Sequence, residues 1–136
     1  MKPLTHFLSS LALAIIIFPF FHWKSLMVFA GGFLIDADHY LWYIYKYRNF
    51  SLLKAYKHFS SHVEKLDFTE DYGILIVFHT IEFLTIMLFL SFYSAYALIF
   101  TFGLLLHYVL DLIFLLSVPK RFVVDHSLVH WVMKNR

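Results

Sequence analysis

Long apolar runs are the feature that most limits what this chain can fold into. Four segments are each long and apolar enough to cross a bilayer, which takes about 20 residues. The runs are Leu-rich and unbroken rather than alternating, so they predict helices and not strands. We therefore expect an all-α protein, an integral membrane four-helix bundle that forms one domain over residues 1–136, with spans at residues 4–21, 26–45, 72–93 and 95–118.

Composition supports this class. Hydrophobic residues make up 61% of the 136 residues and charged residues 15%, with a mean hydropathy of +0.72. A soluble domain carries about 25% charged residues. The chain has no cysteine, which excludes disulfides, thiolate metal sites and cysteine nucleophiles. No pattern for nucleic-acid binding is present, so the expected partner is membrane lipid, and a homo-oligomer stays open.

The lysines and arginines predict the orientation in the membrane. Only Lys24 falls in the loop between the first and second spans. Positive residues favour the cytoplasmic side, so we expect a multi-pass protein of the inner or plasma membrane with both termini cytoplasmic. The ten residues assigned to that side are Lys2, Lys46, Arg48, Lys54, Lys57, Lys65, Lys120, Arg121, Lys134 and Arg136.

The polar segment between the second and third spans contains a predicted amphipathic helix over residues 51–66. Its apolar positions recur at helical spacing, so we expect this helix to lie on the cytoplasmic membrane surface. His58 and His62 sit at the border of the apolar stripe, and His126 and His130 repeat the spacing in the cytoplasmic tail, residues 119–136. We interpret both pairs as interfacial, while a role at a metal site stays open. The stripe comprises Leu52, Tyr56, Phe59, Val63 and Leu66.

Eight histidines and carboxylates lie inside the four predicted spans. A charged residue at the centre of a membrane helix costs about 2.5–3.5 kcal/mol even on the mildest scale, and such residues commonly mark functional sites. At 1.5 Å of rise per residue, all eight fall in the cytoplasmic half of the bilayer, several of them about 10 Å below its surface. We therefore predict one shared metal site, with ligands from His6, Asp36, Asp38, His39, His79, Glu82, His107 and Asp111.

Spacing within the helices agrees with this prediction. His107 and Asp111 are i, i+4, and His79 and Glu82 are i, i+3, so each pair shares a helix face. Four carboxylates need cations for neutrality, and two divalent ions would balance them. Mixed histidine and carboxylate ligation suits zinc, manganese or iron. One or two ions of that kind are expected.

Three strings in the chain resemble a known family. These are "TH" at the start of the first span, "GGFLIDADH" in the second and "GLLLHYVLDLI" in the fourth. They are similar to the YdjM-like family of predicted membrane-bound metal-dependent hydrolases. Two departures are Ile35, where that family typically has proline, and the lack of its internal His-Arg-x-x-x-His-Ser element, for which "HFSSH" or "HTIE" is the nearest string. The resemblance implies a metal-dependent hydrolase with lipid-like substrates.

Our functional hypothesis is an intramembrane metallohydrolase that acts on a lipid-like substrate, a phosphate ester, from the cytoplasmic leaflet. The predicted catalytic residues are Asp38 and Glu82, with Glu82 as general base. The alternative is an ion or proton transporter that uses the same cluster as a relay. No charged residue or histidine lies in the outer half of any span, which disfavours a transport path. Haem ligation by His79 and His107 leaves the carboxylates unexplained.

Overall fold

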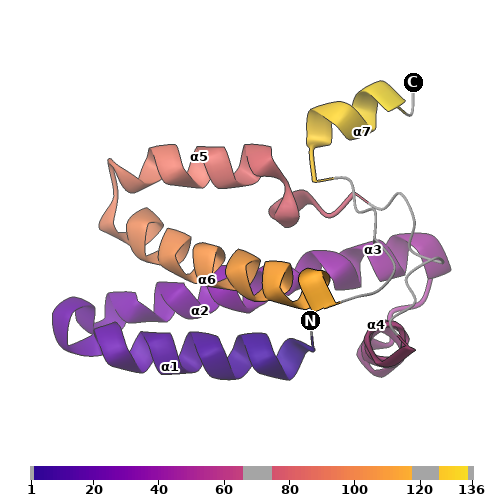
Figure 1. Cartoon of the computed structure of the whole chain (residues 1–136), viewed down its shortest axis with the longest axis horizontal. Helices are drawn as coiled ribbons and strands as arrows, with labels where there is room; N and C mark the ends of the chain where they lie inside the picture. The colour runs from indigo at the N-terminus through magenta and orange to yellow at the C-terminus, as the bar shows by residue number, and fades with distance from the viewer. Residues whose placement is uncertain (1, 66–74, 118–125, 135–136) are drawn as a thin grey trace.

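The computed structural model describes residues 2–65, 75–117 and 126–134, and in these ranges it is helical without a β-strand (Figure 1). The first helix, α1 (Pro3–Phe21), begins with proline, whose missing N–H costs nothing in a first turn. A 3₁₀ turn, η1 (His22–Ser25), then reverses the chain. His22 closes α1 with a positive φ of 47°.

The second predicted span is not one helix. It divides into α2 (Leu26–Gly32), the 3₁₀ turn η2 (Leu34–Asp36) and α3 (Ala37–Tyr47). Phe33 interrupts the helix with φ −130° and ψ −47°. The prediction of an unbroken helix over residues 26–45 is therefore wrong at this point, since apolar content alone carries no signal for the break.

The third predicted span is also shorter than expected. Among its described residues, η4 (Val77–His79) comes first, Thr80 is extended, and α5 (Ile81–Ser91) follows. The Thr80 side chain accepts a hydrogen bond from the Phe83 amide and caps α5. We predicted a helix from residue 72. This is wrong at residues 75, 76 and 80, which are not helical, whereas residues 72–74 lie outside the described ranges.

The remaining helices follow the predictions more closely. The predicted amphipathic helix is present as α4 (Leu52–Lys65), and the fourth span is present as α6 (Ala95–Ser117). Part of the predicted tail forms α7 (Leu128–Lys134). Leu66 and the tail residues 119–125 and 135–136 lie outside the described ranges.

Glycines let α2 and α6 pack closely, with α1 against both (Figure 1). A Cβ on Gly31 would lie 2.1 Å from the Phe100 carbonyl oxygen, and a Cβ on Gly103 would lie 2.2 Å from the Val28 carbonyl oxygen. These contacts are with backbone atoms, which cannot turn aside. The small residues therefore set the spacing of the two helices, as at many helix interfaces in membranes.

Two helical stretches, Pro3–Tyr47 and Ala95–Leu116, contain segments long and apolar enough to cross a membrane. The helix α5 is apolar but shorter. Large apolar side chains cover the outer surface; for example, Phe20 is 78% exposed and Leu116 is 79% exposed. Such a surface indicates contact with lipid or with another protein. By length and composition, the two stretches could cross a membrane.

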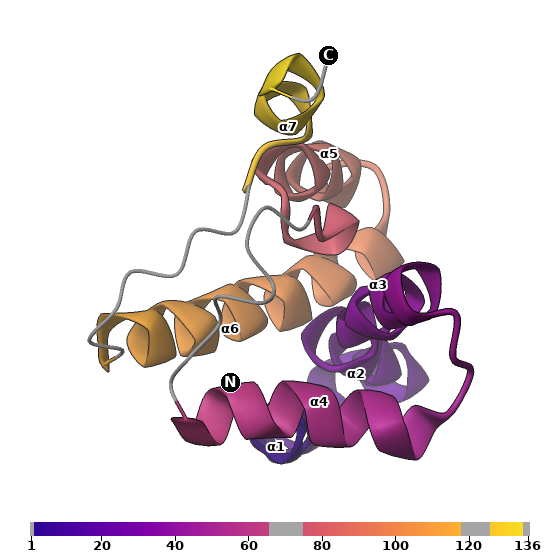
Figure 2. The ribbon, with the colours of Figure 1, turned by 90° about the vertical axis from the view of Figure 1, so that its right-hand side faces the viewer.

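The two ends of the molecule differ in what they contain. The turn between α1 and α2 and the turn between α5 and α6 lie at one end, and the N-terminus, α3, α4 and α7 lie toward the other (Figure 1). Figure 2 looks at this second end, where α4 crosses in front of α1. Lys2 Nζ lies 3.2 Å from Glu64 Oε1, so an ion pair links the start of α1 to the end of α4.

Candidate metal centre

Four potential ligand atoms converge from three parts of the fold. Asp36 comes from η2, His79 from η4, and His107 and Asp111 from α6. The Nε2 atoms of His79 and His107 are 2.9 Å apart. Asp36 Oδ1 lies 3.5 Å from His107 Nε2 and 3.6 Å from His79 Nε2. Asp111 Oδ2 lies 3.1 Å and 3.8 Å from the same two atoms.

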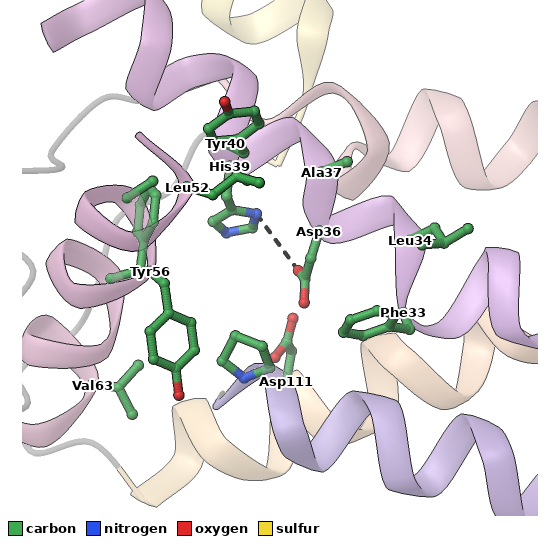
Figure 3. Close-up of a pocket in the computed structure, with 13 residues that line it drawn as sticks. Phe33, Leu34, Asp36, Ala37, His39, Tyr40, Leu52, Tyr56, Val63 and Asp111 are labelled. Atoms are coloured by element: carbon green, nitrogen blue, oxygen red, sulfur yellow. Dashed lines mark ion pairs between the residues drawn. The ribbon is translucent and has the colours of Figure 1, made fainter. Parts of the chain in front are cut away.

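These spacings fit a metal ion. Asp36, His79 and His107 form a group whose ligand atoms all lie close enough to share an ion. Ligands at 2.0–2.1 Å from a tetrahedral ion lie about 3.3 Å apart, and the three separations in this group are 2.9, 3.5 and 3.6 Å. Figure 3 shows the carboxylates of Asp36 and Asp111 facing one another. Buried His and Asp groups of this part of the chain can therefore hold a metal ion.

Hydrogen bonds behind the two imidazoles aim their lone pairs at the centre. His107 Nδ1 lies 2.9 Å from the Gly32 carbonyl oxygen, which can only accept a hydrogen bond. His79 Nδ1 lies 3.1 Å from Asp38 Oδ2, a carboxylate oxygen. Each neutral ring thus carries its proton on Nδ1 and a lone pair on Nε2. Two lone pairs 2.9 Å apart repel each other unless a cation or a proton lies between them.

The broken helix makes this arrangement possible. In an unbroken helix the Gly32 carbonyl would accept the amide of Asp36, four residues later. Here the Asp36 amide bonds the Phe33 carbonyl instead, at 3.2 Å. The Gly32 carbonyl is thereby free to accept from His107, and η2 carries Asp36 to the centre.

Asp38 lies behind His79 rather than at the centre. Its Oδ2 accepts from His79 Nδ1 and from the Phe78 amide, each at 3.1 Å, and its Oδ1 lies 2.9 Å from His39 Nδ1. Carboxylates that hold the far nitrogen of a metal-ligating histidine fix its orientation. Asp38, His39 and His79 also form a second group whose atoms are close enough to share an ion.

His6 lies against the other side of the centre. Its ring stacks on that of His107 with centroids 3.9 Å apart. Its Nε2 lies 3.2 Å from Asp111 Oδ1, and its buried Nδ1 has no hydrogen-bond partner in the described structure. His6, His107 and Asp111 form a third group with metal-binding spacing. Outside that grouping, Asp111 Oδ1 lies near His6 and Asp111 Oδ2 near His107.

Glu82 points away from this cluster. Its carboxylate accepts from the Ser127 hydroxyl at 2.6 Å and from the Leu128 and Val129 amides at 3.0 and 3.2 Å. None of the three groups with metal-binding spacing in the described ranges contains it. The extended Thr80 explains the divergence from His79, because the two residues do not share one helix.

The other histidine pairs also lie outside these groups. The rings of His58 and His62 meet edge to face with centroids 4.3 Å apart, and His58 contacts Tyr43 and Tyr47. The carbonyl of His126 accepts from the Ile81 amide. The ring contacts of His58 agree with a structural role for the first pair, and the interfacial role expected for both pairs stays a prediction.

A half-open pocket of about 280 Å³ reaches the centre from one side (Figure 3). Asp36 and Asp111 line it, and their side chains are 23% and 30% exposed. His79 and His107 are buried behind them. The centre is thus closed on its histidine side and open on its carboxylate side.

Sequence reasoning missed the backbone groups of the site. The Gly32 carbonyl and the Phe78 amide have no signature in residue type, although the glycine pair before a polar element was a usable hint of a break. No protein-family model, curated protein or solved structure matches this chain.

Proposed function

We propose that this protein is a membrane-bound metal-dependent hydrolase that acts on a lipid-like phosphate ester from the cytoplasmic leaflet. The observation that carries the proposal is the convergence of two imidazole nitrogens and two carboxylate oxygens at the inner end of a mainly apolar pocket. The resemblance to the YdjM-like hydrolases supports the same class of reaction, and membership of that family is part of the proposal.

The ligands that we assign are Asp36, His79, His107 and Asp111. Two ionised carboxylates and two neutral imidazoles balance the charge of one divalent ion, which favours one ion rather than two at this point. Zinc, manganese and iron accept this donor set. When bound, such an ion supplies Lewis-acid chemistry, since it polarises a phosphoryl oxygen and acidifies water.

The surrounding residues orient the ligands. Asp38 and the Gly32 carbonyl hold the two imidazoles by their Nδ1 protons. His6 lies beside Asp111 and fixes one of its oxygens, so that the other faces His107. In this proposal Asp38 is a positioning residue, and Glu82 is not the general base because its carboxylate is engaged by Ser127 and α7.

The membrane placement is part of the same proposal. We place α1, α2 with α3, α5 and α6 in the bilayer, with the end that contains α4 and the N-terminus on the cytoplasmic side. The apolar outer surface and the two candidate spans support this placement. The interruptions at Phe33 and Thr80 are then backbone breaks inside a membrane protein, which are tolerated where protein groups satisfy the freed backbone.

The first test is the metal content of detergent-purified protein, measured by mass spectrometry. We expect about one equivalent of zinc, manganese or iron per chain, as for a single cluster of donors. His107→Asn is expected to lose it, because asparagine can still donate to the Gly32 carbonyl but has no counterpart of Nε2. His22→Asn is the matched control, since His22 is exposed in the turn at the opposite end.

Catalysis is tested on the same samples with phosphate esters extracted from membranes. Activity that requires the ion and is lost in His107→Asn supports the hydrolase. Folded protein that binds no metal when zinc, manganese and iron are supplied overturns the proposal. Metal-driven flux through liposomes without product release would instead favour the transporter.

A further inference from the structure

The pocket has two different parts. Its inner end is formed by the carboxylates of Asp36 and Asp111, whereas its walls are mainly apolar (Figure 3). One wall is formed by α4, through residues of the predicted apolar stripe and through Ala55, which lies between them. The α4 residues that line the pocket are Leu52, Ala55, Tyr56, Phe59 and Val63.

The opposite wall comes from the break region and α3. Phe33, Leu34, Ala37 and Tyr40 line it. Tyr40 is fixed by a hydrogen bond from its hydroxyl to the Phe50 carbonyl at 2.8 Å, just before α4 begins. The two walls are therefore linked, and together they form an apolar passage that leads to two acidic groups.

The volume limits what this passage can hold. The cavity of about 280 Å³ lies at the lower end of small-molecule sites, which measure about 300–1,000 Å³, so it suits one narrow ligand rather than several chains side by side.

We propose that the pocket binds the single hydrocarbon chain of an amphiphile whose anionic head lies against Asp36 and Asp111, and that Ala55 sets the width of the chain site. The inference rests on the proposed function for its head-group part. Two bare carboxylates repel an anion, so the head binds only when a cation is held between them. The chain contributes through burial of apolar surface, independently of the ion.

Ala55 is the residue that leaves space for the chain. It is 3% exposed and lies on the inner side of α4 between Leu52 and Phe59. A phenylalanine at this position extends from the wall into the pocket. Leu53 is a neighbour on the same helix but is 62% exposed and does not line the pocket.

The experiment measures binding of alkyl phosphates to full-length protein in nanodiscs by native mass spectrometry, with the bound metal read from the same spectra. Manganese-loaded protein is expected to bind dodecyl phosphate at least tenfold more tightly than butyl phosphate. Ala55→Phe is expected to remove this preference and keep its metal, while Leu53→Phe keeps both. Phe59→Ala widens the same wall and is expected to shift the preference toward hexadecyl phosphate.

The outcomes separate the two proposals. If metal binds but dodecyl and butyl phosphate bind equally, or if neither Ala55→Phe nor Phe59→Ala changes the preference, the chain site is overturned and the metal centre stands. If no metal binds, the hydrolase is overturned, and uncharged dodecanol then tests the chain site alone. Loss of dodecanol binding in Ala55→Phe supports the chain site, and unchanged binding overturns it.

Discussion

At the scale of single residues, the site depends on which nitrogen of each histidine is free. His79 and His107 both donate from Nδ1, to a carboxylate and to a carbonyl, so both Nε2 atoms face inward. The acceptors come from Asp38 and from the backbone of Gly32, which lie close together in sequence on either side of the break. One short segment thereby orients histidines from two other elements.

Asp38→Asn tests the orientation of His79. The asparagine cannot offer two acceptor oxygens to His79, the Phe78 amide and His39 together. We expect metal affinity to fall about 10- to 100-fold while full occupancy is still reached at high metal concentration, as is typical of partners that orient a ligand. The metal affinity of the variant and of the wild type is measured by competition with a chelator of known affinity.

The comparison variant for that experiment is Asp36→Asn, which alters an assigned ligand. It is expected to lower the maximum occupancy itself. Equal affinities for the wild type and Asp38→Asn would show that Asp38 does not orient the site. Zero occupancy at saturating metal in Asp38→Asn would make Asp38 a ligand, as the sequence analysis expected.

At the scale of elements, two interruptions place the site. The break at Phe33 brings Asp36 to the centre, and the extended Thr80 separates His79 from Glu82. Glu82 then serves another contact, because its carboxylate accepts from Ser127 and from the first amides of α7. An acidic group near the start of a helix stabilises it through those free amides.

Glu82→Gln is expected to loosen α7 without affecting the metal centre. Glutamine has one acceptor oxygen in place of two and no charge, so the contact with Ser127, Leu128 and Val129 weakens. The loss of one capping interaction lowers the stability of a helix by about 1 kcal/mol. We therefore expect hydrogen exchange of the amides in α7 to become several-fold faster, with metal content unchanged. Loss of metal with normal exchange would return Glu82 to the site.

At the scale of the whole molecule, the apolar surface and the distribution of charge are the basis of the membrane arrangement proposed above. Lys24 lies in the turn at one end, whereas Lys2, Lys54 and Lys57 belong to the N-terminus and α4 at the other (Figure 1). Positive residues are retained on the cytoplasmic side. In the orientation proposed above, the pocket bordered by α4 lies on the cytoplasmic side.

Single cysteines can test this topology without background, because the chain has none. Trp23 and Lys57 are both exposed and lie near opposite ends. In intact cells a membrane-impermeant maleimide is expected to label Trp23→Cys and to label Lys57→Cys only after permeabilisation. The reverse pattern would invert the topology, and labelling of both in intact cells would exclude a spanning arrangement.

Several elements were predictable because they depend on local pattern. The helices α1, α4 and α6 follow from apolar length and from the helical spacing of the stripe. The i, i+4 spacing of His107 and Asp111 predicts that their side chains are neighbours on one helix face. In the structure, His107 Nε2 lies 3.1 Å from Asp111 Oδ2. The unbroken helix over residues 26–45 and the start of the third span were wrong, because an apolar run has no mark for where the backbone departs from the helix.

The sequence by itself determined the helical class and the kinds of ligand, since hydropathy and residue type are local properties. Only the tertiary structure decided which carboxylates face the centre. Asp36 and Asp38 differ by two positions, yet one faces both Nε2 atoms and the other holds His79 from behind. Residues two apart on a helix already point about 200° from each other, but which of the two faces the histidines depends on contacts such as the hydrogen bond between His107 and the Gly32 carbonyl, 75 residues apart in the chain. A contact over that separation is fixed by packing, which no local pattern records.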